Sequence, residues 1–495
     1  MACVTLKVVL SHLRRDRDLK GMTGHNARTP EIGRDTRGPK VVVIGGGYAG
    51  TLAANRLQRR ADVDITLVNA RPTMVQRLQL HRLAAGTADA DEVTADYRGL
   101  LGERVRLVVG EATRIDTAAR RVQLRSGAPL EYDYLIYAVG STSAVPESVP
   151  GAAEFAYPMA DFESAQRLRA VVDELPAQAW ITVVGAGLTG IEIAAELAEQ
   201  DRTVSLVCGG RLAPAFGEPA RRSIAAWLTA HHVAVLEDDS VVEVRPDAVV
   251  FADGAVRPSA VTVWAGGFGV PQLAAASGLS TDALGRLRTD DTLTSVDDDR
   301  IVGAGDAVTS SATPLRMSCY AAAPTAATAA DTVLSRLDGA EPAPFALAYV
   351  GSTVGLGRRA AVAQFTRADD SPLRAHLRGR IPALIKDAVV KGTLWSIRRE
   401  ARKPGATIWY RGRRSAAPAP VPEPETVRWP WAPPPARPTV NTPNGSPCCG
   451  RCCSPSPTRY SVRRPKPTTC CRTVICAGRR WTSGRCATPR RFWRN

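Results

Sequence analysis

Two glycine-rich turns of the same design, 140 residues apart, constrain the fold of this chain more than any other feature. Each turn follows a run of β-branched residues and precedes a stretch rich in alanine and leucine, which indicates the order strand, turn, helix. In that context the glycines permit a tight turn, close approach of a pyrophosphate and close packing of helix on strand, and the helix N-terminus offers free N–H groups. Two such turns predict two dinucleotide sites and therefore an enzyme that transfers electrons. The glycines on the G-x-G-x-x-G positions are Gly45, Gly47 and Gly50 in the first turn, and Gly185, Gly187 and Gly190 in the second.

The positive charge of the chain is concentrated at its two ends. The net charge is +16, of which residues 1–40 contribute +5 and residues 414–495 contribute +13, so residues 41–413 carry −2. A near-neutral body lacks the basic surface that nucleic-acid binding needs, and we expect no nucleic-acid partner. We predict disorder for residues 1–39 and for the Pro-, Arg- and Cys-rich tail, residues 413–495. For the tail, translation of a wrong reading frame and a metal or nucleic-acid module are open alternatives.

The cysteines follow the same division. Eight of the eleven lie in the tail, whereas residues 41–413 contain only Cys208 and Cys319. The tail cysteines do not form two matching C-x-x-C pairs, so we predict no metal site. The body has no disulfide framework, which indicates a reducing compartment and a cytoplasmic location.

The ends of the chain and its longest uncharged stretch give no sign of a membrane signal. The N-terminal apolar run lacks a basic lead-in and a small-residue cleavage site, so we expect no signal peptide. Residues 258–280 are uncharged but contain four glycines and Pro271, which predicts a strand, a turn and a short helix instead of a membrane span.

The body of the chain alternates strands with helices, which predicts an α/β fold with parallel sheets covered on both faces. Four segments occur in a fixed order: the first turn, A-V-G-S at 138–141, the second turn, and G-A-G-D-A-V at 303–308. In this order they resemble the two-dinucleotide-binding-domain flavoproteins, also called pyridine nucleotide oxidoreductases, over about residues 40–400. The resemblance implies FAD as cofactor and NAD(P)H as co-substrate.

The resemblance also implies two Rossmann-like domains, a small C-terminal α+β domain and a disordered tail. The predicted boundaries are residues 40–150 with 275–335 for the FAD-binding domain, 151–274 for the NAD(P)-binding domain, and 336–412 for a C-terminal interface or membrane-surface domain.

The candidate FAD-binding residues follow from the family motifs. The first turn would hold the pyrophosphate of FAD, and Gly140 lies in a segment similar to the second FAD motif of the family. Asp306, in the pair with Gly305, would accept hydrogen bonds from the ribityl hydroxyls; the alternative is an ordinary helix N-cap. Asn69 stands where a ribose-binding acid is usual and can still pair with ribose hydroxyls.

The second turn continues into Glu192, which completes the NAD(P) signature of the family. In relatives this glutamate lies near the nicotinamide and the flavin, so Glu192 is the candidate catalytic residue, with an exposed helix glutamate as the alternative. At the ribose position of this site stands Cys208, followed by Arg211. The absence of a carboxylate removes repulsion against a 2′-phosphate, which Arg211 could bind. The sequence therefore favours NADPH as the nucleotide and does not exclude NADH. Arg221 and Arg222 are further candidates, with a solvated helix face as the alternative.

The electron acceptor is harder to predict. No cysteine pair lies within residues 41–413, so a redox-disulfide mechanism is not expected, and for Cys319 we expect a small buried apolar role. His81 has a surface or core role by default. Within the family the chain looks most similar to type II NADH dehydrogenases, although the glutamines that line the quinone in that group are absent here. The expected function is an FAD-dependent NAD(P)H dehydrogenase with a quinone-like acceptor. Alternatives are a reductase of ferredoxin or another small electron carrier, and a flavin-binding redox sensor with a basic tail.

Residues 373–399 place apolar side chains at helical spacing among basic ones. This pattern predicts a helix on an anionic membrane surface; packing on its own domain or in a homodimer is the alternative. The apolar positions are Leu377, Ile381, Leu384, Ile385 and Ala388, and the basic ones are Arg374, Arg378, Arg380, Lys386 and Lys391.

Overall fold

The computed structural model describes residues 38–310 and 315–411. All of them fall within one compact unit of the chain, Met1–Ala432. The second unit, Pro433–Asn495, lies outside the described residues, and so do most of the N-terminal extension and all of the tail for which disorder is predicted.

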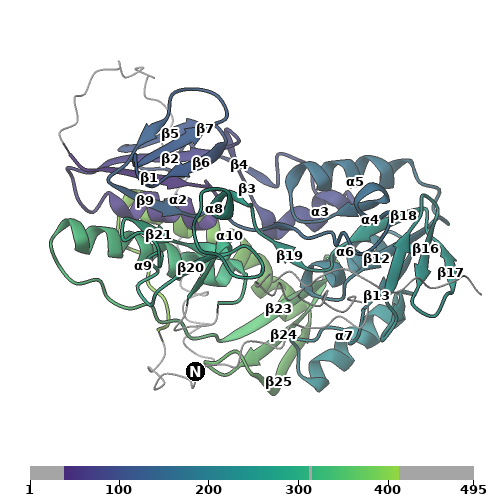
Figure 1. The fold of residues 1–495 in the computed structure, drawn as a ribbon. Coiled ribbons are helices and arrows are strands. Elements are labelled where there is room, and N and C mark those ends of the chain that lie inside the picture. The colour runs from purple at the N-terminus through teal and green to yellow at the C-terminus, as the bar shows by residue number, and fades with distance from the viewer. Residues whose placement is uncertain (1–37, 311–314, 412–495) are drawn as a thin grey trace, which may run out of the picture. The chain divides into compact units, whose positions relative to one another are not determined.

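The first glycine turn belongs to a five-stranded parallel sheet with strand order β21-β9-β1-β2-β5 (Figure 1). Alternate side chains of its first strand are buried on opposite faces, as the period of two requires. Val41 and Val43 pack with helices α2 and α9, whereas Val42 and Ile44 pack with the small antiparallel sheet β6-β7-β8. The elements are β1 (Lys40–Ile44), α2 (Tyr48–Leu57), β2 (Asp64–Asn69), β5 (Val105–Val109), β6 (Ala112–Asp116), β7 (Arg121–Leu124), β8 (Leu130–Glu131), β9 (Tyr134–Tyr137), β21 (Ile301–Gly303) and α9 (Cys319–Leu337).

The second glycine turn belongs to another five-stranded parallel sheet, of order β11-β18-β12-β13-β14. Its construction repeats the first: Ile181 and Val183 face helix α6, and Val184 faces the antiparallel sheet β15-β16-β17 on the other side. The elements are β11 (Ala156–Pro158), α5 (Phe162–Glu174), β12 (Trp180–Val184), α6 (Leu188–Ala198), β13 (Thr203–Val207), α7 (Glu218–Ala230), β14 (Ala234–Leu236), β15 (Val241–Val244), β16 (Ala248–Phe251), β17 (Val256–Pro258) and β18 (Val261–Trp264). The predicted α/β fold with two Rossmann-type sheets is therefore present, while the exact domain boundaries stay predictions.

Short elements connect these layers. They are β3 (Thr73–Val75), η1 (Arg77–Gln79), α3 (Leu80–Ala85), β4 (Thr94–Asp96), β10 (Thr142–Ser143), α4 (Ala152–Phe155), β19 (Phe268–Gly269), α8 (Leu273–Ala276), β20 (Leu287–Thr289), η2 (Gly305–Ala307) and β22 (Val308–Ser310).

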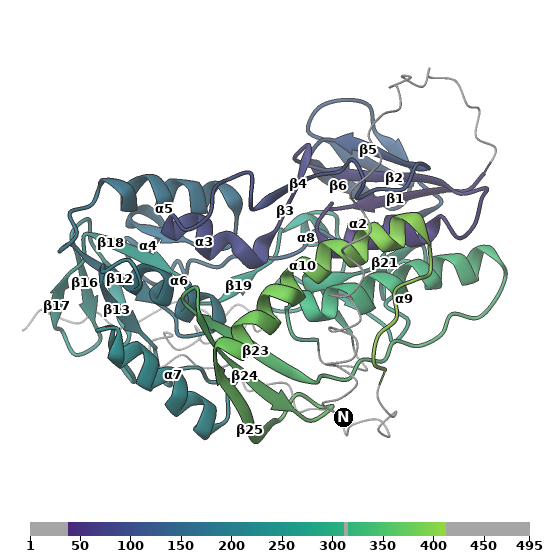
Figure 2. The same cartoon turned by 180° about the vertical axis from the view of Figure 1, so that it is seen from behind.

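The last part of the described chain is an antiparallel sheet followed by a long helix: β23 (Gly351–Leu356), β24 (Ala360–Thr366), β25 (Pro372–Gly379) and α10 (Arg380–Arg402) (Figure 2). The prediction of one helix through residues 373–399 is wrong in its first part, because residues 372–379 pair with β24 as a strand. Gly379, at φ +88°, ends the strand where the helix begins. Among the described helices, none is long and apolar enough to span a bilayer.

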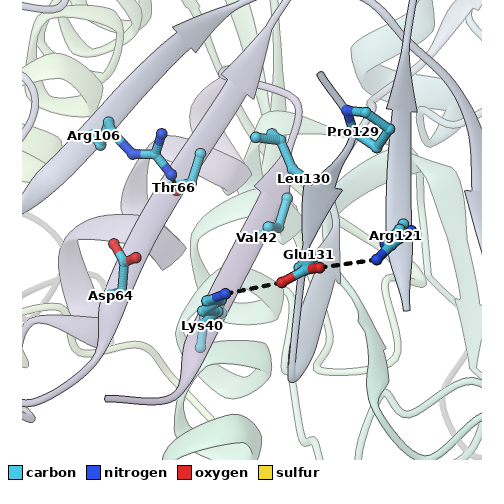
Figure 3. A pocket seen from close by; sticks show the side chains of 10 residues that line it. Lys40, Val42, Asp64, Thr66, Arg106, Arg121, Pro129, Leu130 and Glu131 are labelled. Atoms are coloured by element: carbon cyan, nitrogen blue, oxygen red, sulfur yellow. Dashed lines mark hydrogen bonds and ion pairs between the residues drawn. The ribbon is translucent and has the colours of Figure 1, made fainter. Parts of the chain in front are cut away.

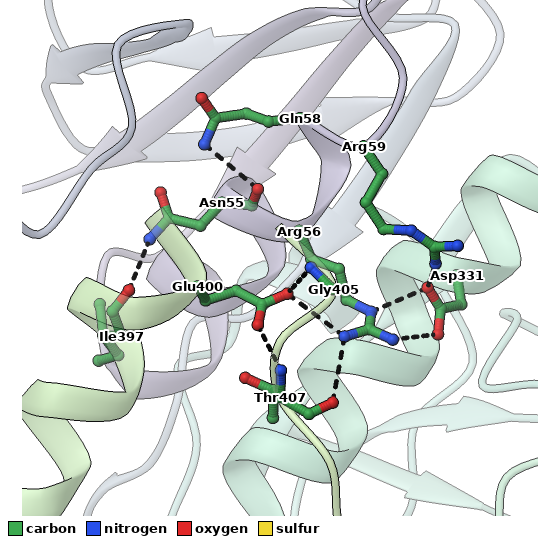
Figure 4. A network of polar contacts seen from close by, with 9 residues as sticks. All are labelled: Asn55, Arg56, Gln58, Arg59, Asp331, Ile397, Glu400, Gly405 and Thr407. Atoms are coloured by element: carbon green, nitrogen blue, oxygen red, sulfur yellow. Dashed lines mark hydrogen bonds and ion pairs between the residues drawn. The ribbon is translucent and has the colours of Figure 1, made fainter. Parts of the chain in front are cut away.

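A buried polar network fastens α10 to α2 (Figure 4). The Glu400 carboxylate, fully buried, accepts hydrogen bonds from Arg56 at 3.3 Å and from the amides of Gly405 and Thr407 at 2.6 Å each. Arg56 also forms a bidentate pair with Asp331 of α9, with both distances 2.8 Å. The two charges are thus fully hydrogen-bonded, which is what makes a buried ion pair tolerable.

Candidate functional site

The first glycine turn has no room for side chains at two of its three motif positions. A Cβ at Gly50 would lie 1.8 Å from the carbonyl oxygen of Gly45, and one at Gly45 would lie 2.3 Å from that of Ala138. At Gly47, in contrast, nothing lies within 4 Å of the position of a Cβ. The backbone is therefore packed tightly on its inner side and open on the side where a ligand would approach.

The second turn repeats this geometry almost atom for atom. A Cβ at Gly190 would lie 1.7 Å from the Gly185 carbonyl oxygen, one at Gly185 would lie 2.7 Å from Ala265, and Gly187 again faces open space. Gly45 and Gly185 share a left-handed φ, +102° and +109°.

Both turns fit a pyrophosphate. Helices α2 and α6 begin after Gly47 and Gly187, and neither has a side-chain cap or an acidic residue in its first turn. The free N–H groups and the positive end of each helix dipole thus face the open side of each turn, where phosphate oxygens would accept hydrogen bonds. The donor set of each turn suits the pyrophosphate of a dinucleotide.

Side chains fix the first turn in place. Asn69 at the end of β2 accepts a hydrogen bond from the Gly46 amide at 2.9 Å, and the Gly46 carbonyl accepts from Tyr97 at 2.7 Å and from Thr51 at 3.0 Å. Asn69 also donates to the Arg71 carbonyl at 2.8 Å, so its amide orientation is fixed. Its binding role toward ribose stays a prediction.

The carboxyl edge of the first sheet brings together three polar side chains from distant segments. Ser141 donates to the Asp306 carboxylate at 2.9 Å, and Arg77 donates to the Ser141 carbonyl at 2.7 Å and to its hydroxyl at 3.3 Å. Asp306 lies inside the 3₁₀ turn η2 (Gly305–Ala307), so the alternative of an ordinary helix N-cap is wrong. The Gly305 amide donates to Thr325 of α9 at 2.9 Å, which holds this turn against the helix.

Arg77 was not identified from the sequence. Burial lowers the pKa of its guanidinium, and the nearby Asp306 carboxylate offsets part of that effect. A guanidinium that is buried beside Asp306 and Ser141 adds a positive charge to the edge where FAD is expected. In the sequence, Arg77 is marked only by its position shortly after the second strand, and such a position does not by itself indicate a role in binding.

Only 12% of the Glu192 side chain is exposed, so the alternative of an exposed helix glutamate is wrong. Its carboxylate accepts from Lys386 of α10 at 2.5 Å and from the Gly355 amide of β23 at 2.9 Å, and it lies 3.6 Å from Nδ1 of His81. Burial opposes ionisation, but Lys386, His81 and the Gly355 amide outweigh it and lower the pKa of Glu192. Burial also lowers the pKa of His81 to about 4, so the imidazole is neutral at physiological pH.

The two cysteines of the described region are both free. Cys319 is the first residue of α9, and burial with the nearby Asp306 raises the pKa of its thiol to about 11. A neutral thiol without a partner cannot form the redox disulfide of the disulfide reductases.

One cavity among the described residues lies outside this site. It has a volume of about 400 Å³ and is lined by Lys40, Asp64, Arg106 and Glu131 among others (Figure 3). Lys40 and Asp64 begin β1 and β2, whereas the glycine turn follows the end of β1, so the cavity lies at the opposite edge of the sheet. Ligands of open α/β sheets bind at the carboxyl edge. Within residues 38–310 and 315–411 no cluster of three metal-ligating side chains occurs.

Comparison with known families decides the identity of this arrangement. The family described as "Pyridine nucleotide-disulphide oxidoreductase" matches residues 39–330, which include both glycine turns and the Gly305–Asp306 pair. The chain belongs to this family. The predictions of an FAD-dependent oxidoreductase and of NAD(P)H as its co-substrate are thereby confirmed.

Known members of the pyridine nucleotide-disulphide oxidoreductase family are similar to the chain in sequence. The NADH dehydrogenase-like protein Rv1812c of Mycobacterium tuberculosis is 32% identical over 293 residues, covering 54% of this chain and 72% of that protein. The NADH dehydrogenase-like protein YutJ of Bacillus subtilis is 28% identical, covering 50% and 70%. The predicted similarity to NADH dehydrogenase-like members is confirmed.

Solved structures share the fold. NDH2 from Plasmodium falciparum in complex with NADH superposes with a TM-score of 0.63 at 16% identity, covering 74% of this chain and 97% of that one. The sulfide:quinone oxidoreductase of Aquifex aeolicus gives a TM-score of 0.63 at 20% identity, covering 73% and 92%. At these identities the likeness shows the Rossmann-type architecture alone.

Proposed function

We propose that the chain is an NAD(P)H dehydrogenase that passes electrons from the nicotinamide nucleotide through FAD to a quinone-like acceptor, without a redox disulfide. When bound, the flavin supplies hydride acceptance and electron storage. The observation that carries the proposal is the cluster of Glu192, Lys386 and His81, each at most 20% exposed, which three separate segments build beside the second turn.

The first turn, Asn69, Gly140, Gly305 and Asp306 would hold FAD. Their support is the open turn at α2 and the fixed position of the Asp306 carboxylate beside Ser141. The second turn would hold the nicotinamide nucleotide on the free N-terminus of α6.

Glu192 would orient the nicotinamide. Lys386 keeps the carboxylate ionised, and the Gly355 amide fixes the orientation of the oxygen that it shares with Lys386. The second oxygen faces the neutral imidazole of His81. A fixed, ionised acceptor can align a carboxamide N–H donor, and alignment of reacting groups contributes strongly to rate.

The test is anaerobic stopped-flow with the FAD-loaded full chain, following the visible absorbance of the flavin after mixing with NADH or NADPH. We expect rapid bleaching with at least one nucleotide, and reoxidation by a soluble quinone faster than by a ferredoxin. Glu192→Gln should slow bleaching by about 100-fold. Glu196→Gln is the matched control one turn along α6, because burial raises the pKa of Glu196 toward the neutral form that glutamine imitates. Flavin that neither nucleotide reduces would rule out the dehydrogenase and favour the redox sensor.

A quinone acceptor suggests contact with a membrane surface, and α10 offers a candidate face. Ile381, Leu384 and Val389 of this helix are 66%, 69% and 49% exposed. Exposed basic side chains, Arg380 and Lys391, lie on the same helix. An apolar strip beside basic groups suits the interface of an anionic bilayer.

Co-sedimentation with vesicles tests this contact. We expect the full chain to bind vesicles that contain anionic lipid, and Leu384→Asp to abolish binding while flavin reduction by the nucleotide is retained. If the wild-type protein ignores vesicles but elutes as a dimer that Leu384→Asp dissociates, the face is a homodimer interface instead.

A further inference from the structure

The ribose end of the second dinucleotide site carries no acidic side chain at the position that reads a ribose diol. The strand β13 ends at Val207, and the next residue is Cys208, whose pKa is raised to about 12 by burial and by Glu237 and Asp238. The thiol is therefore neutral. Gly209 and Gly210 follow with left-handed φ values and with open space where a Cβ would stand. An added group on this ribose meets no side chain at Gly209 and Gly210, and the nearby carboxylates of Glu237 and Asp238 would have to be offset by positive charge.

Three arginines converge beyond the glycines on one carboxylate. Glu218, the first residue of α7, lies 3.3 Å from Arg211 and 3.8 Å from Arg222, and Arg221 donates to it as well. The side chains of Arg211 and Arg222 are 66% and 71% exposed, so both are free to change partner. Nε of Arg221, which is buried, has no hydrogen-bond partner among the described residues.

The charges of this arginine cluster do not balance. Arg221 also reaches Glu237 at 3.3 Å, so three guanidinium groups share two carboxylates. Glu237 is itself engaged by the Leu212 amide at 2.7 Å. One carboxylate offers two oxygens, whereas a phosphate monoester offers three and carries about −1.5 to −2 charges. Guanidinium groups bind such oxygens in pairs, which makes the cluster better suited to a phosphate than to Glu218.

The position of the cluster identifies which phosphate it fits. In a Rossmann-type sheet the adenosine ribose lies at the end of the second strand, where an acid selects NAD and an arginine accommodates the 2′-phosphate of NADP. We propose that the nucleotide of this enzyme is NADPH, with Arg211, Arg221 and Arg222 binding its 2′-phosphate and Glu218 occupying them while the site is empty. The proposal rests on the proposed function, since it names the substrate of the same hydride transfer.

Two measurements on the FAD-loaded full chain test it. The first compares kcat/KM of flavin reduction for NADPH and NADH. The second is calorimetric binding of adenosine 2′,5′-bisphosphate against adenosine 5′-monophosphate, which needs no turnover. We expect about tenfold or greater preference for NADPH and for the bisphosphate, since one charge-assisted contact is worth a factor of that size.

Variants separate the cluster from general effects. Arg211→Ala should lower kcat/KM for NADPH by about tenfold and leave NADH unchanged. Glu218→Gln should raise affinity for the bisphosphate, because the arginines lose their internal partner. Arg245→Ala, which removes an exposed arginine paired with Glu243 elsewhere in the same part of the chain, should change neither nucleotide.

The outcomes are distinguishable from failure of the proposed function. Reduction by neither nucleotide overturns the dehydrogenase itself. Reduction by NADH that equals or exceeds NADPH, with equal affinity for the two adenosine phosphates, overturns only the cluster assignment and leaves Glu237 as the group that reads the ribose hydroxyls. Equal effects of Arg211→Ala on both nucleotides overturn it as well.

Discussion

The two glycine turns have nearly the same close backbone contacts, but they differ in the hydrogen bonds that fix their backbone. At the first turn, Asn69, Tyr97 and Thr51 all bind the backbone of Gly46. At the second turn the corresponding residue, Ala186, accepts one backbone hydrogen bond, from the Ala213 amide at 3.1 Å.

The difference matches the roles proposed for the two nucleotides. A turn that is held by three side chains has little freedom to relax when its ligand leaves, which suits a cofactor that stays bound. A turn that is held by its own backbone can adjust as a substrate enters and leaves in each cycle. With these proposed roles, the glycine pattern would specify pyrophosphate binding, and the side chains around each turn would set how long its nucleotide stays bound.

The largest expected effect comes from filling the turns. Gly50→Val should yield protein without FAD, and Gly190→Val should retain FAD but reduce it about 100-fold more slowly, because each new side chain displaces one helix from its strand. The absorbance spectrum of the purified protein and stopped-flow reduction measure the two effects. Gly47→Ala and Gly187→Ala, where space is open, should fold normally. Loss of FAD from Gly190→Val would show that the two turns are not separable.

The anchoring of the first turn extends to the far end of α2, through Arg56 and Glu400. Glu400→Gln should lower the free energy of unfolding by about 3–5 kcal/mol, because it leaves the buried Arg56 charge poorly compensated. Urea denaturation monitored by flavin and by tryptophan fluorescence measures the loss. Glu103→Gln, at an exposed position, is the control and should be neutral. An unchanged unfolding midpoint for Glu400→Gln would contradict the idea that this network anchors α2.

Acid should destabilise the surroundings of the second glycine turn before those of the first. His81 beside α6 has its pKa lowered to about 4, mainly by burial, with Glu192 opposing and Lys386 assisting. Between about pH 4 and the usual histidine pKa of about 6.5, the unfolded chain therefore binds more protons at His81 than the folded protein does. Stability contributed by neutral His81 is complete above about pH 6.5 and falls by roughly 3 kcal/mol as the pH decreases toward 4.

Unfolding free energies at pH 7 and pH 5 measure this slope. We expect His81→Gln to flatten it, while His232→Gln, at an exposed position, leaves it as in the wild type. An identical slope in His81→Gln would exclude His81 as the source.

The smallest effects concern the residues at the strand ends. Asn69→Ala leaves the Gly46 amide without its partner and should weaken FAD binding by about tenfold. Cys208→Ala should leave both FAD affinity and nucleotide KM nearly unchanged, because the weak contact of its sulfur is with the Leu206 carbonyl at 3.9 Å. Titration of apoprotein with FAD and steady-state kinetics compare the two variants. Equal effects of Asn69→Ala and Cys208→Ala would contradict the proposed difference between a first turn fixed by side chains and a second turn that can adjust.

Local signals account for what could be predicted from the sequence. The turns, the strands before them and the Gly305–Asp306 pair depend on neighbouring residues, and the structure shows the expected strand, turn and helix at both turns. The surroundings of Glu192 could not be predicted, because Lys386 lies 194 residues away along the chain and only the folded C-terminal segment brings it near. Arg77 and Ser141 meet for the same reason, 64 residues apart.

The segment 372–379 shows how tertiary pairing overrides a local pattern. Its leucines, Leu373 and Leu377, have helical spacing and continue the apolar positions of α10. The backbone instead completes its hydrogen bonds with β24, and Gly379 provides the left-handed φ for the change of direction. A strand whose partner is supplied by the fold cannot be recognised from its own residues.

Helix α10 carries Lys386, which reaches the helix of the second turn, and Glu400, which reaches the helix of the first. These two anchoring residues of α10 are fourteen residues apart, which corresponds to about 21 Å at the rise of an α-helix. Deleting one residue between Lys386 and Glu400 would shorten this span by about 1.5 Å and rotate one of the two side chains by about 100° away from its partner. Gly392, between them, faces open space and would accept many side chains. The spacing of this stretch is thus constrained far more strictly than its composition.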